Sequence, residues 1–253
     1  MCCFSGPVQE VHQTRIFARA VSAARQVLVY QMKIATEKPV AMILPLPVPK
    51  DSQQDDLVWI NLKPYPTFFK DLEAGFDLDI SSPVIPGDLK RYEVGDFHTS
   101  FAPTLKDMYR LHKDFELSIE VWENLPAYKD YGFAIFQLKP GRTEAHPMAF
   151  EFSRRVAESE NGKLFFPTVH IHDGKVHKTA EFDHLLYLQR APEARPLVKT
   201  RWLESPKPVN TFLNLEQTGY DGPTKQKQSL VDPTSHAHRA EFIGRFKNVD
   251  ILI

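Results

Sequence analysis

Residues 26–46 read QVLVYQMKIATEKPVAMILPL and contain two of the strongest strand signals in the chain. The first run, 26–34, is rich in β-branched and aliphatic side chains, and the second, Val40–Leu46, begins with five apolar residues in succession. A continuous apolar run is typical of a central strand that is covered on both faces. Because proline has no backbone N–H to donate, we expect strand pairing to stop at the prolines that follow, Pro45, Pro47 and Pro49.

Similar signals recur along the whole chain, at residues 14–21, 57–62, 133–138, 148–152, 164–172 and 182–188. One helix is expected from Thr104 to Phe115, capped by Thr104 and Asp107, and a shorter one from Thr67 to Ala74 before Gly75. The sequence therefore predicts a single α+β domain over residues 1–253, β-rich and mainly antiparallel, with one or two short helices. A Pro-rich segment at about 191–233 is expected to be irregular.

Composition and charge exclude several classes of protein. The chain is 42% hydrophobic and 25% charged, which is typical of a globular domain rather than a disordered one. Its 31 Lys and Arg residues balance 32 Asp and Glu residues, so we expect no nucleic-acid partner. Apolar runs are all shorter than the roughly 18 residues of a membrane span, so we expect no membrane association. Whether a small molecule or a protein is the partner stays open.

The two cysteines, Cys2 and Cys3, are adjacent and cannot join distant parts of a fold by a disulfide. The N-terminal residues also lack the apolar stretch of a secretory signal. Both observations favour a cytoplasmic location.

Five short stretches are suggestive when they are taken in order: Cys2–Phe4, Arg25–Val29, Ala41–Pro49, Phe133–Lys139 and Phe165–Pro167. This arrangement resembles an uncharacterised bacterial family whose members carry a Cys near the mature N-terminus and a run similar to VVPVP. No activity is attached to that family. The resemblance therefore implies a single β-rich domain and no mechanism.

The sharpest local signal is VHIHDGKVH at residues 169–177. Asp-Gly between two strand-forming runs is typical of a two-residue hairpin turn, which places His172 opposite Lys175 and His170 opposite His177. Because strand side chains alternate, Ile171 and Val176 would share one face, and His170, His172 and His177 the other. Three imidazoles on one face could bind Zn or another divalent transition metal. Our principal hypothesis is therefore a histidine-ligated metal-binding protein, with possible enzymatic activity.

A fourth metal ligand has several candidates in the sequence. They are Glu181, Asp183, Glu241, His184, the pair His236 and His238, and the thiols of Cys2 and Cys3. The competing interpretation is an ordinary amphipathic hairpin that buries Ile171 and Val176 and leaves its histidines on a solvated face. His98 and His146 stand alone in the sequence and are weaker candidates for catalysis.

Two alternatives belong to other functional classes. If Met1 is removed, Cys2 holds a thiol and an α-amine in one residue, which is the chemistry of N-terminal-nucleophile amidohydrolases. The other alternative is a non-catalytic, β-rich interaction module. Phosphate-binding motifs such as GxGxxG and GxxxxGK[ST] are absent from the sequence, so a nucleotide site of those types is not expected.

Overall fold

The computed structural model describes residues 3–76, 98–111, 117–138, 140–144, 146–155, 163–190 and 201–253. Strands dominate these residues, and neighbouring strands pair antiparallel except where β2 (Glu10–Ala20) lies parallel to β11 (Thr179–Gln189). The predicted β-rich, mainly antiparallel character is confirmed.

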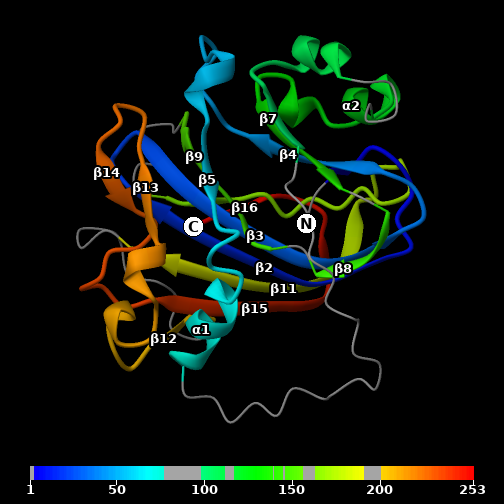
Figure 1. Ribbon diagram of the computed structural model, residues 1–253. Helices are drawn as coiled ribbons and strands as arrows, with labels where there is room; N and C mark the ends of the chain where they lie inside the picture. Colours follow the sequence, from blue (N-terminus) through cyan, green and yellow to red (C-terminus); the bar gives the residue numbers. More distant parts are fainter. Residues whose placement is uncertain are drawn as a thin grey trace.

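Most strands belong to two sheets (Figure 1). The larger has eight strands, in the order β12 (Leu203–Glu204), β15 (His238–Lys247), β11, β2, β3 (Arg25–Thr36), β9 (Met148–Ser153) and β5 (Val58–Asn61), with β8 (Gly141–Glu144) also paired to β3. The smaller has the order β1 (Cys3–Phe4), β4 (Val40–Leu46), β7 (Gly132–Leu138) and β6 (His98–Ala102). Two further pairs join β10 (Phe165–Phe166) to β16 (Ile251–Leu252) and β13 (Gly219–Asp221) to β14 (Lys227–Ser229).

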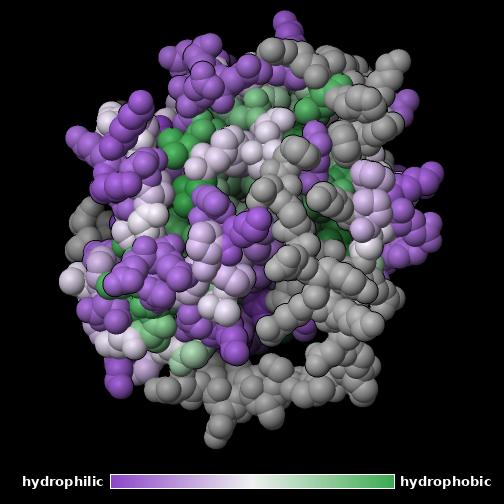
Figure 2. Space-filling view, in the orientation of Figure 1, coloured by the Kyte–Doolittle hydropathy of each residue, from purple (hydrophilic) through white to green (hydrophobic). Residues whose placement is uncertain are grey.

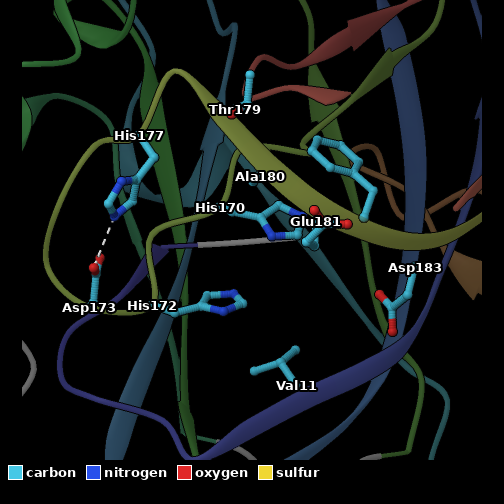
Figure 3. A pocket seen from close by; sticks show the side chains of 10 residues that line it. Val11, His170, His172, Asp173, His177, Thr179, Ala180, Glu181 and Asp183 are labelled. Carbon is cyan, nitrogen blue, oxygen red and sulfur yellow. Dashed lines mark hydrogen bonds and ion pairs between the residues drawn. The ribbon is translucent and has the colours of Figure 1, made fainter. Parts of the chain in front are cut away.

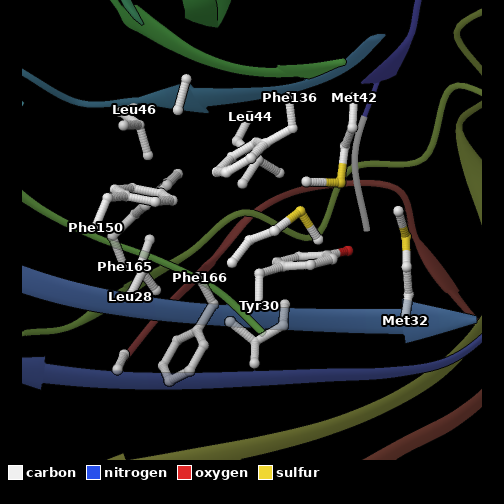
Figure 4. Packing of buried hydrophobic residues seen from close by; sticks show 14 of the residues in the cluster. Leu28, Tyr30, Met32, Met42, Leu44, Leu46, Phe136, Phe150, Phe165 and Phe166 are labelled. Atoms are coloured by element: carbon white, nitrogen blue, oxygen red, sulfur yellow. The ribbon is translucent and has the colours of Figure 1, made fainter. Parts of the chain in front are cut away.

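The core fills the space between the two sheets and continues on their outer faces. Alternate residues of β3 point in opposite directions: Leu28 and Tyr30 pack toward β4, and Val27 and Val29 pack into a second cluster. Figure 4 shows the first cluster, in which β3 side chains meet Met42, Leu44 and Leu46 of β4 and the rings of Phe136 and Phe150. Burial on both faces explains the continuous apolar runs of these strands.

Two short helices cover the outer faces. Helix α1 (Phe68–Ala74), predicted from the sequence, packs Phe68, Phe69 and Leu72 against the larger sheet, and α2 (Ile119–Glu123) packs against the smaller one (Figure 1). Gly75 after α1 is required by packing, because a Cβ there would lie 2.5 Å from the Phe212 ring.

The predicted helix from Thr104 to Phe115 is wrong in type and length. Its capping box forms, since the Asp107 carboxylate accepts hydrogen bonds from both the backbone N–H and the hydroxyl of Thr104. The segment is nevertheless a 3-10 helix over Leu105–Arg110, and the backbone becomes extended at Leu111. Residues 112–116 lie outside the described part of the chain.

The expected end of pairing at Pro45 is also corrected. The β4–β7 ladder continues through Pro45, opposite Phe133, to Leu46. Ala41 exchanges hydrogen bonds with Ser5 on the side of β1, and Pro45, four residues on, faces the same side. Because β1 pairs only with Met42 and Ile43, the missing N–H of Pro45 interrupts no ladder.

Polar side chains dominate the face of the described residues seen in Figure 2. Among the described residues no helix is long and apolar enough to cross a membrane.

Candidate functional site

The predicted histidines lie at a pocket of about 520 Å³ between the segment that follows β10 and the first half of β11 (Figure 3). Its lining includes all three predicted histidines. It also includes two carboxylates on β11 and one on the loop that precedes β11. These residues are His170, His172, His177, Asp173, Glu181 and Asp183, together with Val11, Thr179, Ala180 and Phe182. Several of the chemistry-bearing residues proposed from the sequence therefore gather at this pocket.

The segment that carries His170 is held by side chains from the turn between β15 and β16 (Ile251–Leu252). The Asn248 amide accepts a hydrogen bond from the backbone N–H of His170 (2.7 Å) and donates to the carbonyls of His170 (2.9 Å) and His177 (3.1 Å). Two residues further on, Asp250 accepts hydrogen bonds from the backbone N–H groups of Thr168 and Val169. Asn248 thus makes the hydrogen bonds to the backbone of His170 that a neighbouring strand would otherwise make.

Neither the predicted hairpin ladder nor its two-residue turn forms, because a type I′ turn needs a positive φ at both Asp173 and Gly174 and only Gly174 has one. Gly174 has φ +72°, and the Asp173 carboxylate accepts a hydrogen bond from the backbone N–H of Lys175. Across the described residues 163–178, however, the only strand is β10, and Ile171 makes an isolated parallel bridge to Cys3. The competing partner is Asn248, which bonds the carbonyls that cross-strand pairing would have used.

The predicted division between the two faces of this segment is correct for the apolar pair. Ile171 is fully buried in the cluster beneath α2, and Val176 packs against the same cluster. His170 and His172 point the other way, into the pocket.

Three imidazole rings, His170, His172 and His184, are in contact. The His170 ring lies 5.2 Å from the His172 ring and 5.0 Å from the His184 ring, measured between centroids. The Nε2 atoms of His170 and His184 are 3.3 Å apart. Phe182 stacks on His170 at 4.5 Å and packs edge-on against His184 at 4.7 Å, so its ring holds these two imidazoles in place, while Phe4 contacts His172 edge-on at 5.5 Å.

Burial keeps these imidazoles neutral. It lowers the pKa of His170 from its usual 6.5 to about 2 and that of His172 to about 4. The pKa of the fully buried His184 is lowered well below 6.5 for the same reason. At neutral pH all three rings can therefore serve as hydrogen-bond partners or metal ligands rather than as cations.

His177 does not join the other two histidines of the predicted set. Its Nε2 lies 2.9 Å from Oδ2 of Asp173, and Figure 3 shows the ring turned toward that carboxylate at the edge of the pocket. The place expected for His177 beside His170 is taken by His184, which the sequence suggested only as an optional fourth ligand. Because Phe182 and His184 are two residues apart on β11, they share a face, and Phe182 packs on His170.

The other candidate ligands lie elsewhere in the fold. His236 and His238 lie near Glu204, and Glu241 accepts a hydrogen bond from Arg239. Cys3 is buried in the cluster beneath α2, while Cys2 and the side chain of His98 lie outside the described residues. His146 contacts the carbonyl of Pro147. In the described part of the chain no group of three or more His, Cys, Asp or Glu side chains is arranged to hold a metal ion.

The carboxylate of Asp183, which lines the pocket, is held by the backbone of β2. Gln13, at a bulge in β2, has φ 56° and donates its backbone N–H to Oδ2 of Asp183 at 2.6 Å. Oδ1 of Asp183 is buried and accepts no hydrogen bond from the described residues. Burial raises the pKa of Asp183.

Replacing Asn248 is expected to loosen the pocket. Asn248→Ala removes three hydrogen bonds to the backbone of residues 170 and 177, and because Asn248 is buried we expect a loss of about 2 kcal/mol in the free energy of unfolding. Urea denaturation measures this loss, and amide hydrogen exchange should rise at residues 170–177. Asn248→Asp keeps the acceptor but places a buried carboxylate oxygen against the carbonyls of His170 and His177, so it should be destabilised at least as much as the alanine variant. Unchanged exchange at His170 in Asn248→Ala would contradict this assignment.

No family model and no curated protein matches the sequence. Among solved structures, the crystal structure of baculovirus P35 is similar over 99% of this chain and 98% of its own, with 18% sequence identity and a TM-score of 0.53. The chain has the fold of P35. This likeness concerns the fold alone, and the resemblance to a bacterial family stays a prediction.

Two further P35 structures resemble the chain less closely. The crystal structure of the caspase-8/P35 complex matches with 15% identity over 95% of each chain and a TM-score of 0.49. A mutated P35 after caspase cleavage, at 2.7 Å resolution, matches with 18% identity over 95% of this chain and 98% of its own, with a TM-score of 0.48.

Proposed function

We propose that this chain is a protein-binding module whose partner is a protease of the caspase class. The observation that carries the proposal is the P35 fold, which extends over nearly the whole of both chains rather than over a shared substructure. P35 itself has been crystallised in complex with caspase-8. The step from P35 to this chain is an analogy between folds, so a binding experiment must test it.

The histidines of the pocket are packed against other rings. His170 contacts Phe182 and two other imidazoles, and His172 contacts Phe4 and His170. The amidohydrolase hypothesis depends on Cys2, which lies outside the described residues, and it stays a prediction.

Purified caspase-8 offers a direct test. The enzyme is incubated with increasing amounts of the chain, and turnover of a small peptide substrate is followed. We expect turnover to fall until the two proteins are equimolar, and the complex to elute as one peak in size-exclusion chromatography, because a protein-binding module should form a stoichiometric complex.

Chymotrypsin serves as the specificity control and should retain its activity. Mass spectrometry of the mixture reports whether the chain is cut. Full caspase-8 turnover with separate elution of the two proteins would refute the proposal. Rapid cutting of the chain without loss of turnover would make it a substrate rather than a binding partner.

A further inference from the structure

His170 and His184 have the separation that one tetrahedral metal ion requires. Zinc binds imidazole nitrogen at about 2.0–2.1 Å, and two such bonds at the tetrahedral angle place the nitrogens about 3.3–3.4 Å apart. The two Nε2 atoms are 3.3 Å apart. From this geometry we propose that His170 and His172, which line the pocket, and the fully buried His184 beside them form a zinc-binding site, independent of protease binding.

His172 is suited to be the third ligand. Its ring centroid is 5.2 Å from that of His170, close to the 5.0 Å that separates the rings of His170 and His184. The Nε2 atom of His172 is buried and has no hydrogen-bond partner among the described residues. Since no three donors converge in the present arrangement, metal binding requires the His172 side chain to rotate toward the other two. His172 lines the pocket, which gives its ring space to move.

The residues around the three histidines favour metal binding. Histidine binds a metal only in its neutral form, and the burial of these rings keeps them neutral at pH 7. Phe182 packs on both His170 and His184, so these two ligands are held in place before the metal arrives. The open side of the pocket leaves a fourth position for water, the arrangement found where three protein ligands bind zinc.

The simpler interpretation of the 3.3 Å contact is a hydrogen bond between two neutral imidazoles. The two interpretations predict different behaviour. A hydrogen-bonded pair takes up no metal, whereas a ligand pair takes up one ion per chain.

Metal titration of the full chain distinguishes them. After treatment with a chelator, the protein is titrated with Zn²⁺ by calorimetry and with Co²⁺ by visible absorption. We expect one ion per chain, with a Kd of about 10 µM or tighter for Zn²⁺ and the strong visible bands of tetrahedral Co²⁺. Zinc should also raise the Tm, because it binds the folded state.

Single variants test the ligand set. His170→Gln and His184→Gln should each weaken zinc binding by more than about 100-fold, because each removes a ligand. His177→Gln is the matched control, since it changes a histidine of the same pocket that pairs with Asp173, and it should bind zinc as the wild type does. Circular dichroism of each metal-free variant checks its fold.

The proposal fails if wild-type protein takes up no stoichiometric metal, the result expected for a hydrogen-bonded pair only. It also fails if His177→Gln weakens binding as much as His170→Gln does. Should His170→Gln or His184→Gln not fold, the Co²⁺ spectrum of the wild type still decides, because octahedral bands would exclude a tetrahedral histidine site. Caspase-8 binding is measured in separate metal-free samples, so either proposal can fail alone.

Discussion

At pH 5 the protein is expected to be several kcal/mol less stable to unfolding than at pH 7, because three buried histidines remain neutral in the folded state. His184 is fully buried and His170 nearly so, and burial lowers the pKa of each far below 6.5. In the unfolded chain these two and His172 return to a pKa of about 6.5. Below that pH the unfolded state therefore binds protons that the folded state does not.

The direction and size of the change follow from proton linkage. A histidine with a lowered folded-state pKa contributes its full stability above pH 6.5 and loses about 1.4 kcal/mol for each pH unit below it. Three such groups, His170, His172 and His184, over about 1.5 pH units give a loss of about 6 kcal/mol. Asp183 and Asp250 have pKa values raised by burial and offset part of this loss, because the folded state gains stability when those carboxylates take up a proton.

Urea denaturation at pH 7, 6 and 5 measures the effect. His184→Gln should be less stable than the wild type at pH 7, and removing one of three such histidines should reduce the histidine part of the pH dependence by about one third. His177→Gln retains all three buried imidazoles, so it should follow the wild-type curve. If the free energy of unfolding fell equally steeply with pH in the wild type and in His184→Gln, the buried imidazole of His184 would not be a cause of the pH dependence.

The strands could be predicted because their pattern is local. The β3 and β4 runs are apolar at successive positions, and the structure covers both faces of both strands. Helix α1 could be predicted for a similar reason, since its apolar positions and the Gly75 that follows it lie within eight residues. The segment after Thr104 shows the limit of such signals, because a capping box forms equally well at the start of a 3-10 helix.

The candidate site could be predicted only in part because its geometry depends on distant residues. The sequence is enough to predict that His170 and His172 share a face, because alternate side chains of an extended segment point the same way. His177 was assigned to the cluster on the assumption that residues 170–177 pair with each other. Asn248 bonds their backbone instead, and it lies more than 70 residues further along the chain. His184 joins the group of histidines only because β11 packs against residues 170–172.

The second large effect is expected at Asp250, which anchors the segment leading to His170. Its Oδ1 accepts hydrogen bonds from the backbone N–H groups of Thr168 (2.8 Å) and Val169 (3.1 Å), and its Oδ2 accepts one from the hydroxyl of Tyr128 (2.6 Å). Burial raises the pKa of Tyr128, so that hydroxyl keeps its proton and remains a donor. One carboxylate thus joins the α2 region, the pocket segment and the C-terminal strands.

Asp250→Ala leaves these three donors without an acceptor. Because three buried donors would be left without a partner, we expect a loss of about 3 kcal/mol in the free energy of unfolding. Burial raises the pKa of Asp250 itself, so the size of the loss is attributed to the three hydrogen bonds and not to the charge. Asp250→Asn retains an oxygen for the two backbone donors, but its NH2 group replaces the oxygen that accepts from Tyr128, so the Tyr128 hydroxyl must turn and accept instead. Its loss should be about 1 kcal/mol. Chemical denaturation compares the two variants. A loss in Asp250→Ala no larger than that in Asp250→Asn would show that the backbone of Thr168 and Val169 finds another acceptor.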